Sequence, residues 1–273
     1  MNLLKNLSPI LSPNERMPLL FVGHGNPMNA IEENQFVNGF RHIAETIPKP
    51  TAIICISAHW VTKGTKVTAM ERPRTIHDFG GFPKELYEVQ YPAKGSPELA
   101  KKTRQISHPE IIELDKEWGL DHGAWSVIKH FYPKADIPVI ELSLDYSKPA
   151  KYHFELAKKL KSFRENGILI IGSGNIIHNL RLIDFQNFNK IDYGFDWAIE
   201  SRETINNLLK DGNFDPLINY ERLGKAVQLA IPTPEHFLPL LYILALKYEK
   251  ESISLFNDNL LAGSLSMTSV KIS

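Results

Sequence analysis

Residues 52–60 read AIICISAHW, an apolar and β-branched run that leads through Ser57 and Ala58 to His59. The run predicts a strand over Ala52–Ser57, and because it is apolar throughout rather than alternating, this strand should be buried on both faces. Such strands are typical of parallel sheets covered by helices. Four other runs, bounded by Gly, Ser, His or Asp, also predict strands. They are Leu19–Val22, Lys66–Ala69, Pro138–Leu144 and Ile168–Ile171.

Helix-like stretches alternate with these strands, and capping or breaking residues mark their ends. They are Pro97–Ile106, Ala124–Phe131, Ala150–Arg164, Asp192–Lys210 and Pro234–Lys247. The alternation predicts an α/β fold, a single domain with a central mostly parallel sheet flanked by helices. We assign residues 18–273 to this domain. Residues 1–17, which are polar and interrupted by prolines, are expected to form an N-terminal extension.

Composition narrows the class of protein. Lys and Arg number 31 and Asp and Glu number 31, so the formal net charge is zero and neither a nucleic acid nor an anionic membrane is indicated as a partner. The single cysteine, Cys55, excludes an intrachain disulfide and a CxxC zinc site. No apolar run reaches a membrane span, and residues 1–17 lack the features of a secretory signal. These features predict a cytoplasmic protein.

One connection is too long for a simple turn. Residues 72–95 are rich in Pro, Gly and aromatic residues and contain His77 next to Asp78. Long ordered loops often cover active sites, so this segment is a candidate cover, and Phe82, Tyr87 and Tyr91 are candidate walls for an aromatic ring. A structural excursion packed on the surface explains the composition as well.

Three of the ten histidines lie where predicted strands run out into small residues. His24 follows Leu19–Val22, His59 follows Ala52–Ser57, and His178 lies beyond Ile168–Ile171. The carboxyl ends of parallel strands meet at one edge of a sheet, where ligands bind in such folds, so these imidazoles are expected to converge there. His236 is expected to open the helix Pro234–Lys247, held in place by two flanking prolines.

Imidazole is a common ligand for zinc and for non-heme iron, so the converging histidines indicate a metal site. Three ligands with an open position are typical of a catalytic centre. Hydrogen-bonded structural histidines are the alternative. His122, at a predicted helix start, could serve as a proton donor, as a hydrogen-bond partner of the substrate or as a capping group.

Seven motifs, taken together and in order, resemble the DOPA-type extradiol ring-cleavage dioxygenases, a class III family related to protocatechuate 4,5-dioxygenase. The resemblance runs from about Leu19 to the C-terminus. The motifs are Gly23-His24-Gly25-Asn26-Pro27, Ser57-Ala58-His59-Trp60, Tyr91-Pro92-Ala93, Leu120-Asp121-His122-Gly123, Ala135-Asp136-Ile137-Pro138-Val139, Ile171-Gly172-Ser173-Gly174 and Pro234-Glu235-His236-Phe237-Leu238-Pro239-Leu240.

The resemblance implies a role for each of five histidines. His24 and His59 match the two histidine ligands of the family, and His236 matches the third ligand, which is a carboxylate in the protocatechuate enzymes. His178 matches the catalytic base, which can also complete the metal shell in the DOPA-type branch. His122 matches a histidine near the substrate. The implied metal ligands are therefore His24, His59, His178 and His236, and the implied catalytic residues are His178 and His122.

The implied activity is the opening of a small catechol such as DOPA by O2 (4,5-cleavage) at a histidine-bound divalent metal. Fe(II) is the ion expected for activity, while Zn(II) is expected in a purified sample because an all-histidine site accepts zinc readily. Plant members carry a Pro-Ser pair after the position of His178, whereas Asn179-Leu180 follows here. That difference is expected to affect substrate choice.

Two other functions fit the same residues. A zinc hydrolase on this scaffold would use Glu235, His178 or Asp121 as its general base and metal-bound water as the nucleophile. A non-enzymatic binding protein would need no intact site. The full set of histidines favours an enzyme over the binding protein.

Overall fold

The computed structural model describes residues 16–188 and 190–273. Most of the expected N-terminal extension, residues 1–15, lies outside this range. Of the remaining two residues, Met17 is buried, and its amide donates a hydrogen bond to the carbonyl of Arg164 at 3.0 Å. Among the helices of the described residues, none combines the length and the apolar character that crossing a membrane requires.

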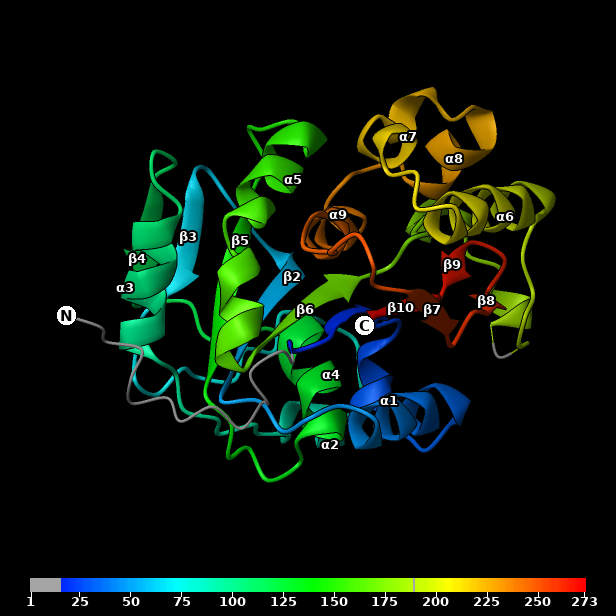
Figure 1. The fold of residues 1–273 in the computed structure, drawn as a ribbon. Helices are drawn as coiled ribbons and strands as arrows, with labels where there is room; N and C mark the ends of the chain where they lie inside the picture. Colours follow the sequence, from blue (N-terminus) through cyan, green and yellow to red (C-terminus); the bar gives the residue numbers. More distant parts are fainter. Residues whose placement is uncertain (1–15, 189) are drawn as a thin grey trace.

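The described residues build an eight-stranded mixed sheet in the order β4-β3-β5-β2-β6-β1-β10-β7 (Figure 1). The four central strands β5, β2, β6 and β1 run parallel, whereas β10 is antiparallel to β1 and β3 is antiparallel to β5. The strands are β1 (Leu19–Gly23), β2 (Ala52–Thr62), β3 (Thr65–Thr68), β4 (Ile112–Asp115), β5 (Val139–Asp145), β6 (Ile168–Gly174), β7 (Ile253–Phe256) and β10 (Ser269–Ile272), with a separate pair β8 (Leu260–Leu261) and β9 (Leu265–Ser266).

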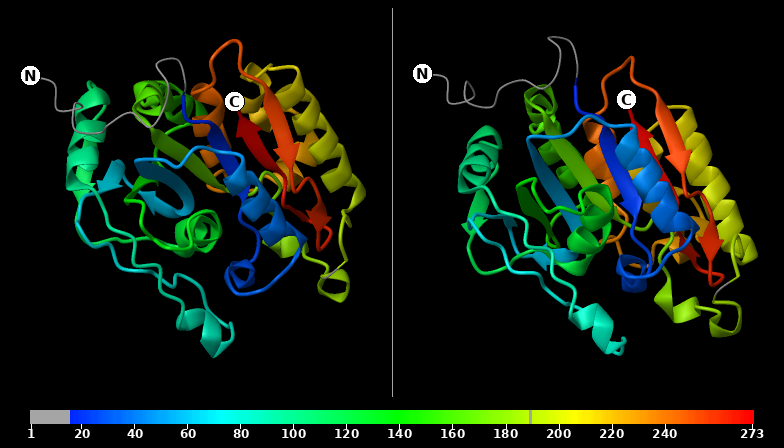
Figure 2. Two further views of the ribbon diagram at one scale, coloured as in Figure 1. Left: turned by 60° about the horizontal axis from the view of Figure 1, so that its bottom comes forward. Right: turned by 90° about the horizontal axis from the view of Figure 1, so that it is seen from below.

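Helices cover both faces of this sheet (Figures 1 and 2). One face carries α5 and α9, which pack on each other, and the other carries α1 and α4. The helices are α1 (Gln35–Glu45), α2 (Lys84–Tyr87), α3 (Pro97–Ile106), α4 (His122–Phe131), α5 (Ala150–Lys158), α6 (Asp196–Lys210), α7 (Asp215–Ile218), α8 (Lys225–Ala230) and α9 (Leu238–Ala245). The predicted single α/β domain with a mostly parallel sheet is confirmed.

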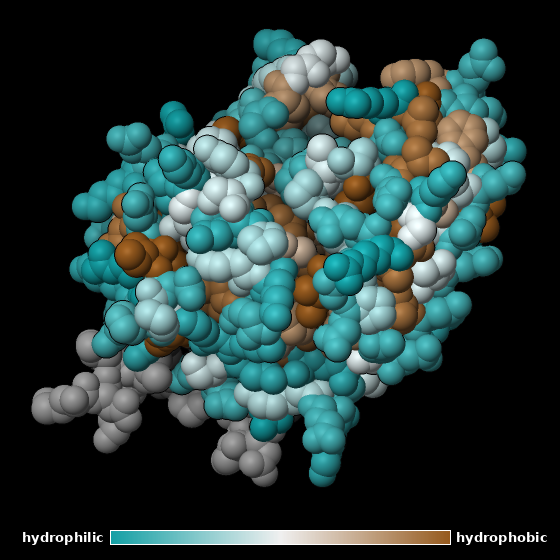
Figure 3. Space-filling view, turned by 90° about the horizontal axis from the view of Figure 1, so that it is seen from above, coloured by the Kyte–Doolittle hydropathy of each residue, from teal (hydrophilic) through white to brown (hydrophobic). Residues whose placement is uncertain are grey.

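The central strands are buried on both sides, as their continuous apolar runs require. In β1, Leu19 and Phe21 face the core beneath α5 and α9, whereas Leu20 and Val22 face the core beneath α1 and α4. Cys55 in β2 is fully buried, and burial raises the pKa of its thiol. The face seen in Figure 3 shows hydrophobic side chains only as separate patches among hydrophilic ones.

Two strands extend further than predicted. β6 continues through Gly172-Ser173-Gly174, where a turn was expected after Ile171. The glycines serve close packing here, since a Cβ at Gly172 would lie 2.6 Å from the carbonyl oxygen of Pro239 and one at Gly174 would lie 2.1 Å from that of His236. β2 continues to Thr62, so His59 lies within the strand and not after it.

Four helices differ from prediction at an end. α4 begins at His122, two residues before the predicted start at Ala124. The prediction that His236 opens a helix is wrong: α9 begins at Leu238, and Pro239, not Pro234, occupies the first turn, where a missing amide is tolerated. α6 begins at Asp196 because Asp192 has a positive φ of 53°, which a helix excludes. α5 ends at Lys158, and a short 3-10 turn follows over Lys161–Asn166.

Candidate metal centre

Strand register brings the first two histidines to the same level of the sheet. β6 lies between β1 and β2, and its Ser173 pairs with Val22 of β1 on one side and with Ser57 of β2 on the other. His24 and His59 each come two residues beyond this shared level. The β2–β5 register shifts between Ile56 and Val61, and this irregularity contains His59. A bulge of this kind redirects a side chain next to an active site.

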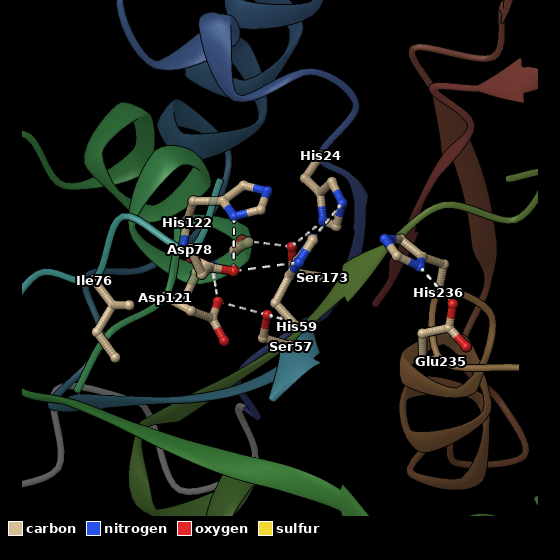
Figure 4. Close-up of polar contacts among 12 residues, drawn as sticks. His24, Ser57, His59, Ile76, Asp78, Asp121, His122, Ser173, Glu235 and His236 are labelled. Atoms are coloured by element: carbon tan, nitrogen blue, oxygen red, sulfur yellow. Dashed lines mark hydrogen bonds and ion pairs between the residues drawn. The ribbon is translucent and has the colours of Figure 1, made fainter. Parts of the chain in front are cut away.

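The two imidazoles face each other across the end of β6 (Figure 4). The Nε2 atoms of His24 and His59 lie 3.3 Å apart. Two nitrogens bound at 2.0–2.1 Å to one tetrahedral ion are separated by about 3.3 Å. The spacing of this pair therefore suits two ligands of a single metal ion.

The outward nitrogens of these rings have oxygen partners. Nδ1 of His24 lies 3.0 Å from Oγ of Ser173, whose own hydroxyl donates to the carbonyl of Gly123 at 2.6 Å. Because the hydroxyl hydrogen of Ser173 is used in this bond, its oxygen can only accept, and the hydrogen between the two residues lies on Nδ1 of His24. Nδ1 of His59 lies 3.3 Å from Oδ2 of Asp78. Such outer partners hold metal-binding histidines in the tautomer whose Nε2 is free to bind.

His236 reaches the centre from the segment before α9. Its ring centroid lies 5.3 Å from that of His24 and 5.1 Å from that of His59, and the residue is 7 % exposed. Its Nδ1 faces Oε1 of Glu235 at 3.4 Å. The amide of Asn175 donates to the carbonyl of His236 at 3.0 Å, which ties this segment to the end of β6.

His178 stacks flat on His236, with 3.5 Å between ring centroids and 11° between planes. Its ligand atoms lie within 4.8 Å of those of Glu235 and His236, in a group beside the one that His24, His59 and His122 form. The amide of His178 donates to the carbonyl of Ala230 at 2.9 Å. The structure thus brings together all five histidines selected from the sequence, and His178 joins the cluster through its stacking on His236.

His122 opens α4 and is brought against the same centre. Its ring centroid lies 3.8 Å from that of His59 and 5.9 Å from that of His24. The helix is capped by Asp121, which accepts hydrogen bonds from the amide of Ala124 at 3.1 Å and from the hydroxyl of Ser57 at 2.7 Å. The Ser57 hydroxyl therefore joins the strand before His59 to the helix that carries His122.

Burial keeps most of these histidines neutral. Removal from water is the largest cause that lowers the pKa of His24, His59 and His236, and neighbouring imidazoles lower those of His24 and His59 further. Burial, followed by the field of His236, lowers the pKa of His178 to about 3. Burial tends to raise the pKa of Glu235, but its hydrogen bonds with His236 and Thr233, a backbone hydrogen bond and the field of His236 together outweigh this and lower it to about 2. Neutral imidazoles are the form that binds a metal ion.

Sequence reasoning missed the oxygen partners Ser57, Ser173 and Asp78 as site residues. Their only signal was proximity in the sequence: Ser57 lies in the motif that carries His59, Ser173 lies five residues before His178, and Asp78 follows His77. In the structure His77 contacts the carbonyl of Val89 at 2.9 Å. Asp78, not His77, is the polar side chain of this loop that reaches the histidine cluster.

The expected aromatic walls are also revised. Tyr91 is 2 % exposed and donates its hydroxyl to the carbonyl of Tyr132, so it belongs to the core. Phe79 lies against His122, with 5.4 Å between ring centroids, and Phe82 packs edge-on to Phe79 at 5.3 Å. Tyr87 packs on Phe79 at 5.1 Å and is 38 % exposed. Phe79 is therefore the aromatic side chain that touches the cluster.

Comparison with known proteins agrees with this geometry. Residues 18–262 match the family described as the catalytic LigB subunit of aromatic ring-opening dioxygenase. The chain is a member of the LigB family.

LigB-family relatives resemble it over nearly the whole chain. It is 46 % identical to the 4,5-DOPA dioxygenase extradiol of Escherichia coli (strain K12), over 96 % of this chain and 97 % of that protein. It is 34 % identical to the 4,5-DOPA dioxygenase extradiol of Beta vulgaris, over 92 % and 94 %. A crystal structure of an uncharacterised protein from Escherichia coli K12 has the same fold, with a TM-score of 0.82 and 42 % identity, covering 94 % of this chain and 100 % of that one. The protein is thus an enzyme of the extradiol dioxygenase class.

Proposed function

We propose that this LigB-family enzyme opens the ring of a small catechol, such as DOPA by 4,5-cleavage, with O2 at a divalent metal ion held by His24, His59 and His236. One observation carries the proposal: Nε2 of His24 faces Nε2 of His59 at 3.3 Å, while the Nδ1 atoms of both rings are turned to oxygen atoms. We further propose that residues 18–273 form the catalytic domain.

The donor set fits a divalent ion that binds imidazole, and three protein ligands leave positions open for substrate. Fe(II) held by these histidines would supply the redox chemistry that a reaction between a catechol and dioxygen needs, whereas Zn(II), with a filled d shell, would supply none. We propose Fe(II) as the working ion and Zn(II) as an ion that the same histidines accept.

His178 is proposed to take a proton from the catechol. Its imidazole is buried beside His236 and is neutral, which is the form that has a lone pair to accept a proton. Its stacking on His236 places it beside a proposed ligand and leaves it available either to accept a proton or to join the metal shell. His122 is proposed to hydrogen-bond the oxygen substrate, since it touches His59 and is held by Asp78.

Reconstitution tests the proposal. The metal is removed, the protein is loaded anaerobically with Fe(II) or Zn(II), DOPA and simple catechols are added in air, and oxygen uptake and the yellow ring-opened product are followed. Oxygen uptake with iron and none with zinc is expected. In His178→Asn, kcat should fall while iron is retained, whereas His24→Ala should lose both.

The alternative function, zinc-dependent hydrolysis, has a distinct signature in the same experiment. It would appear as turnover of an ester or amide by the zinc-loaded protein without oxygen consumption. Absence of oxygen uptake across a panel of catechols with both ions would contradict the proposed activity.

A further inference from the structure

Asp78 connects the long loop to two histidines of the centre. Its Oδ1 accepts a hydrogen bond from the amide of His122 at 2.8 Å. Its Oδ2 lies 2.9 Å from Nδ1 of His122 and 3.3 Å from Nδ1 of His59. One carboxylate therefore contacts the start of α4 and two imidazoles from different elements, as Figure 4 shows.

The chemistry of a carboxylate determines what these contacts require. An ionised Asp accepts hydrogen bonds and donates none, so an Nδ1 that hydrogen-bonds to it must carry the hydrogen. A neutral imidazole has one hydrogen, and its Nε2 is then a free lone pair. Nε2 of His59 is the atom that faces His24 at 3.3 Å. Asp78 thus favours the tautomer of His59 that is able to bind a metal ion.

The loop segment that carries Asp78 is itself held against the start of α4. The amide of Ile76 donates to the carbonyl of Leu120 at 2.7 Å, and the amide of Leu120 donates to the carbonyl of Arg74 at 2.8 Å. The indole of Trp125 donates to the carbonyl of Ile76 at 2.7 Å. From this anchored stretch the rest of the loop runs outward to α2, as the cyan segment of Figure 2 shows.

We propose that Asp78 is a positioning residue that sets the tautomers of His59 and His122. The proposal rests on the proposed metal site. It assigns the loop a role in preparing ligands, in addition to any role as a cover. Partners of this kind typically contribute 10- to 100-fold to metal affinity.

Asp78→Asn is a sharp test because the side chain keeps its size but exchanges one oxygen for an NH2 group. If the amide nitrogen faces the two rings, both are driven to the other tautomer, with the hydrogen on Nε2. If the side-chain amide takes the flipped orientation, its NH2 group faces the backbone N–H of His122. Two hydrogen-bond donors then oppose each other. Asp78→Ala complements it, since it removes the acceptor whichever way an amide would turn.

A matched control separates this effect from loosening of the loop. Thr75 accepts a hydrogen bond from the amide of Tyr91 at 3.0 Å within the same segment. Thr75→Val keeps the shape and removes that bond without touching a histidine. Thermal unfolding of the metal-free variants shows whether all of them are folded.

Two readouts are measured on the full chain. In the metal-free protein, ¹⁵N NMR of the imidazoles should show Nδ1-protonated His59 and His122 in the wild type and a changed tautomer in Asp78→Asn or Asp78→Ala. Zn²⁺ affinity, measured against a chelating indicator, should fall by about 10- to 100-fold in both Asp78 variants and by less than about threefold in Thr75→Val.

The outcomes distinguish the two proposals. Unchanged tautomers in both Asp78 variants would overturn the role of Asp78, as would an equal loss of Zn²⁺ affinity in Thr75→Val. A wild-type protein that binds no Zn²⁺ or Fe²⁺ would overturn the metal site of the proposed function, while the NMR comparison in metal-free protein would still decide whether Asp78 sets the tautomers.

Discussion

The Nε2 atoms of His24 and His59 lie 3.3 Å apart although 35 residues separate the two histidines in the chain. β6 produces this relationship, because its Ser173 pairs with Val22 of β1 and with Ser57 of β2, and each histidine lies two residues further on. The spacing of the proposed ligand pair is therefore set by the register of β1, β6 and β2.

His24→Ala and His59→Ala should each abolish metal retention. Even outer partners of a ligand contribute about 10- to 100-fold to affinity, so loss of a ligand should lower Zn²⁺ affinity by at least about 100-fold. Metal content after gel filtration and titration with a chelating indicator measure this. His42→Ala, at an exposed position on α1, is the control. Full metal content in both site variants would show that the assignment is wrong.

Gly123→Ala should displace His59. A Cβ at this position would lie 2.5 Å from Oγ of Ser57 and 2.8 Å from Cδ2 of His59, closer than atoms pack. Either α4 or β2 must shift, and metal affinity should fall by about 10-fold or more. Gly80→Ala is the matched control, since a Cβ there meets no atom within 4 Å. Equal Zn²⁺ affinity in the two variants would contradict this account.

The metal-free protein should lose stability as the pH falls below about 6.5. His178 has a pKa of about 3 in the folded state against an ordinary value of 6.5, so between these values the unfolded chain binds a proton that the folded chain does not. Folding stability therefore decreases as the pH falls through this window. The pKa values of His24, His59 and His236 are lowered too and act in the same direction.

Replacement of His178 isolates one part of this dependence. His178→Asn should flatten the slope of unfolding free energy against pH by up to about 1.4 kcal/mol per pH unit below pH 6.5. Urea unfolding between pH 5 and pH 7.5 measures the slope, in a range above the titration of ordinary carboxylates. A slope identical to that of wild type would show that His178 is already protonated in the folded state, or that its pKa is the same in the folded and unfolded states.

Arg164→Leu should destabilise the fold without altering the metal centre. Arg164 is fully buried, donates to the carbonyls of Met17 and Leu246 at 2.9 and 2.8 Å, and pairs with Glu251. Removing one partner of a buried pair costs about 3–5 kcal/mol. For a domain of this size that corresponds to a fall in Tm of roughly 6–20 °C. Zn²⁺ affinity of the folded variant, measured well below its Tm, should equal that of wild type.

The sequence allowed the central sheet to be predicted because its strands are apolar on both faces. The strands that begin at Leu19, Ala52 and Ile168 could be predicted without knowledge of tertiary contacts. The proximity of the histidines beyond them followed from the convergence of parallel strands. The short strands β4 and β7 to β10 were not predicted. Of these, β7 (Ile253–Phe256) is only partly buried and shows no run of this kind.

Details of the site depended on contacts between distant segments. The bulge that holds His59 inside β2 arises from pairing with β5, and the glycines after Ile171 reflect the approach of the His236 segment. Asp78 lies in a loop without periodicity, so nothing local showed that it would meet two imidazoles. The histidines of the proposed centre could thus be selected from the sequence, whereas their hydrogen-bond partners could not.

The position of β10 has a consequence for biosynthesis. This strand pairs with β1, which leads to His24, yet it is translated after every other strand described here. His236 is also translated long after β1, β2 and β6. A nascent chain still on the ribosome therefore exposes His24 and His59 before their third partner and before the strand that encloses β1 exist. Metal loading of the proposed site is accordingly expected only after His236 and β10 have been translated and β10 has paired with β1.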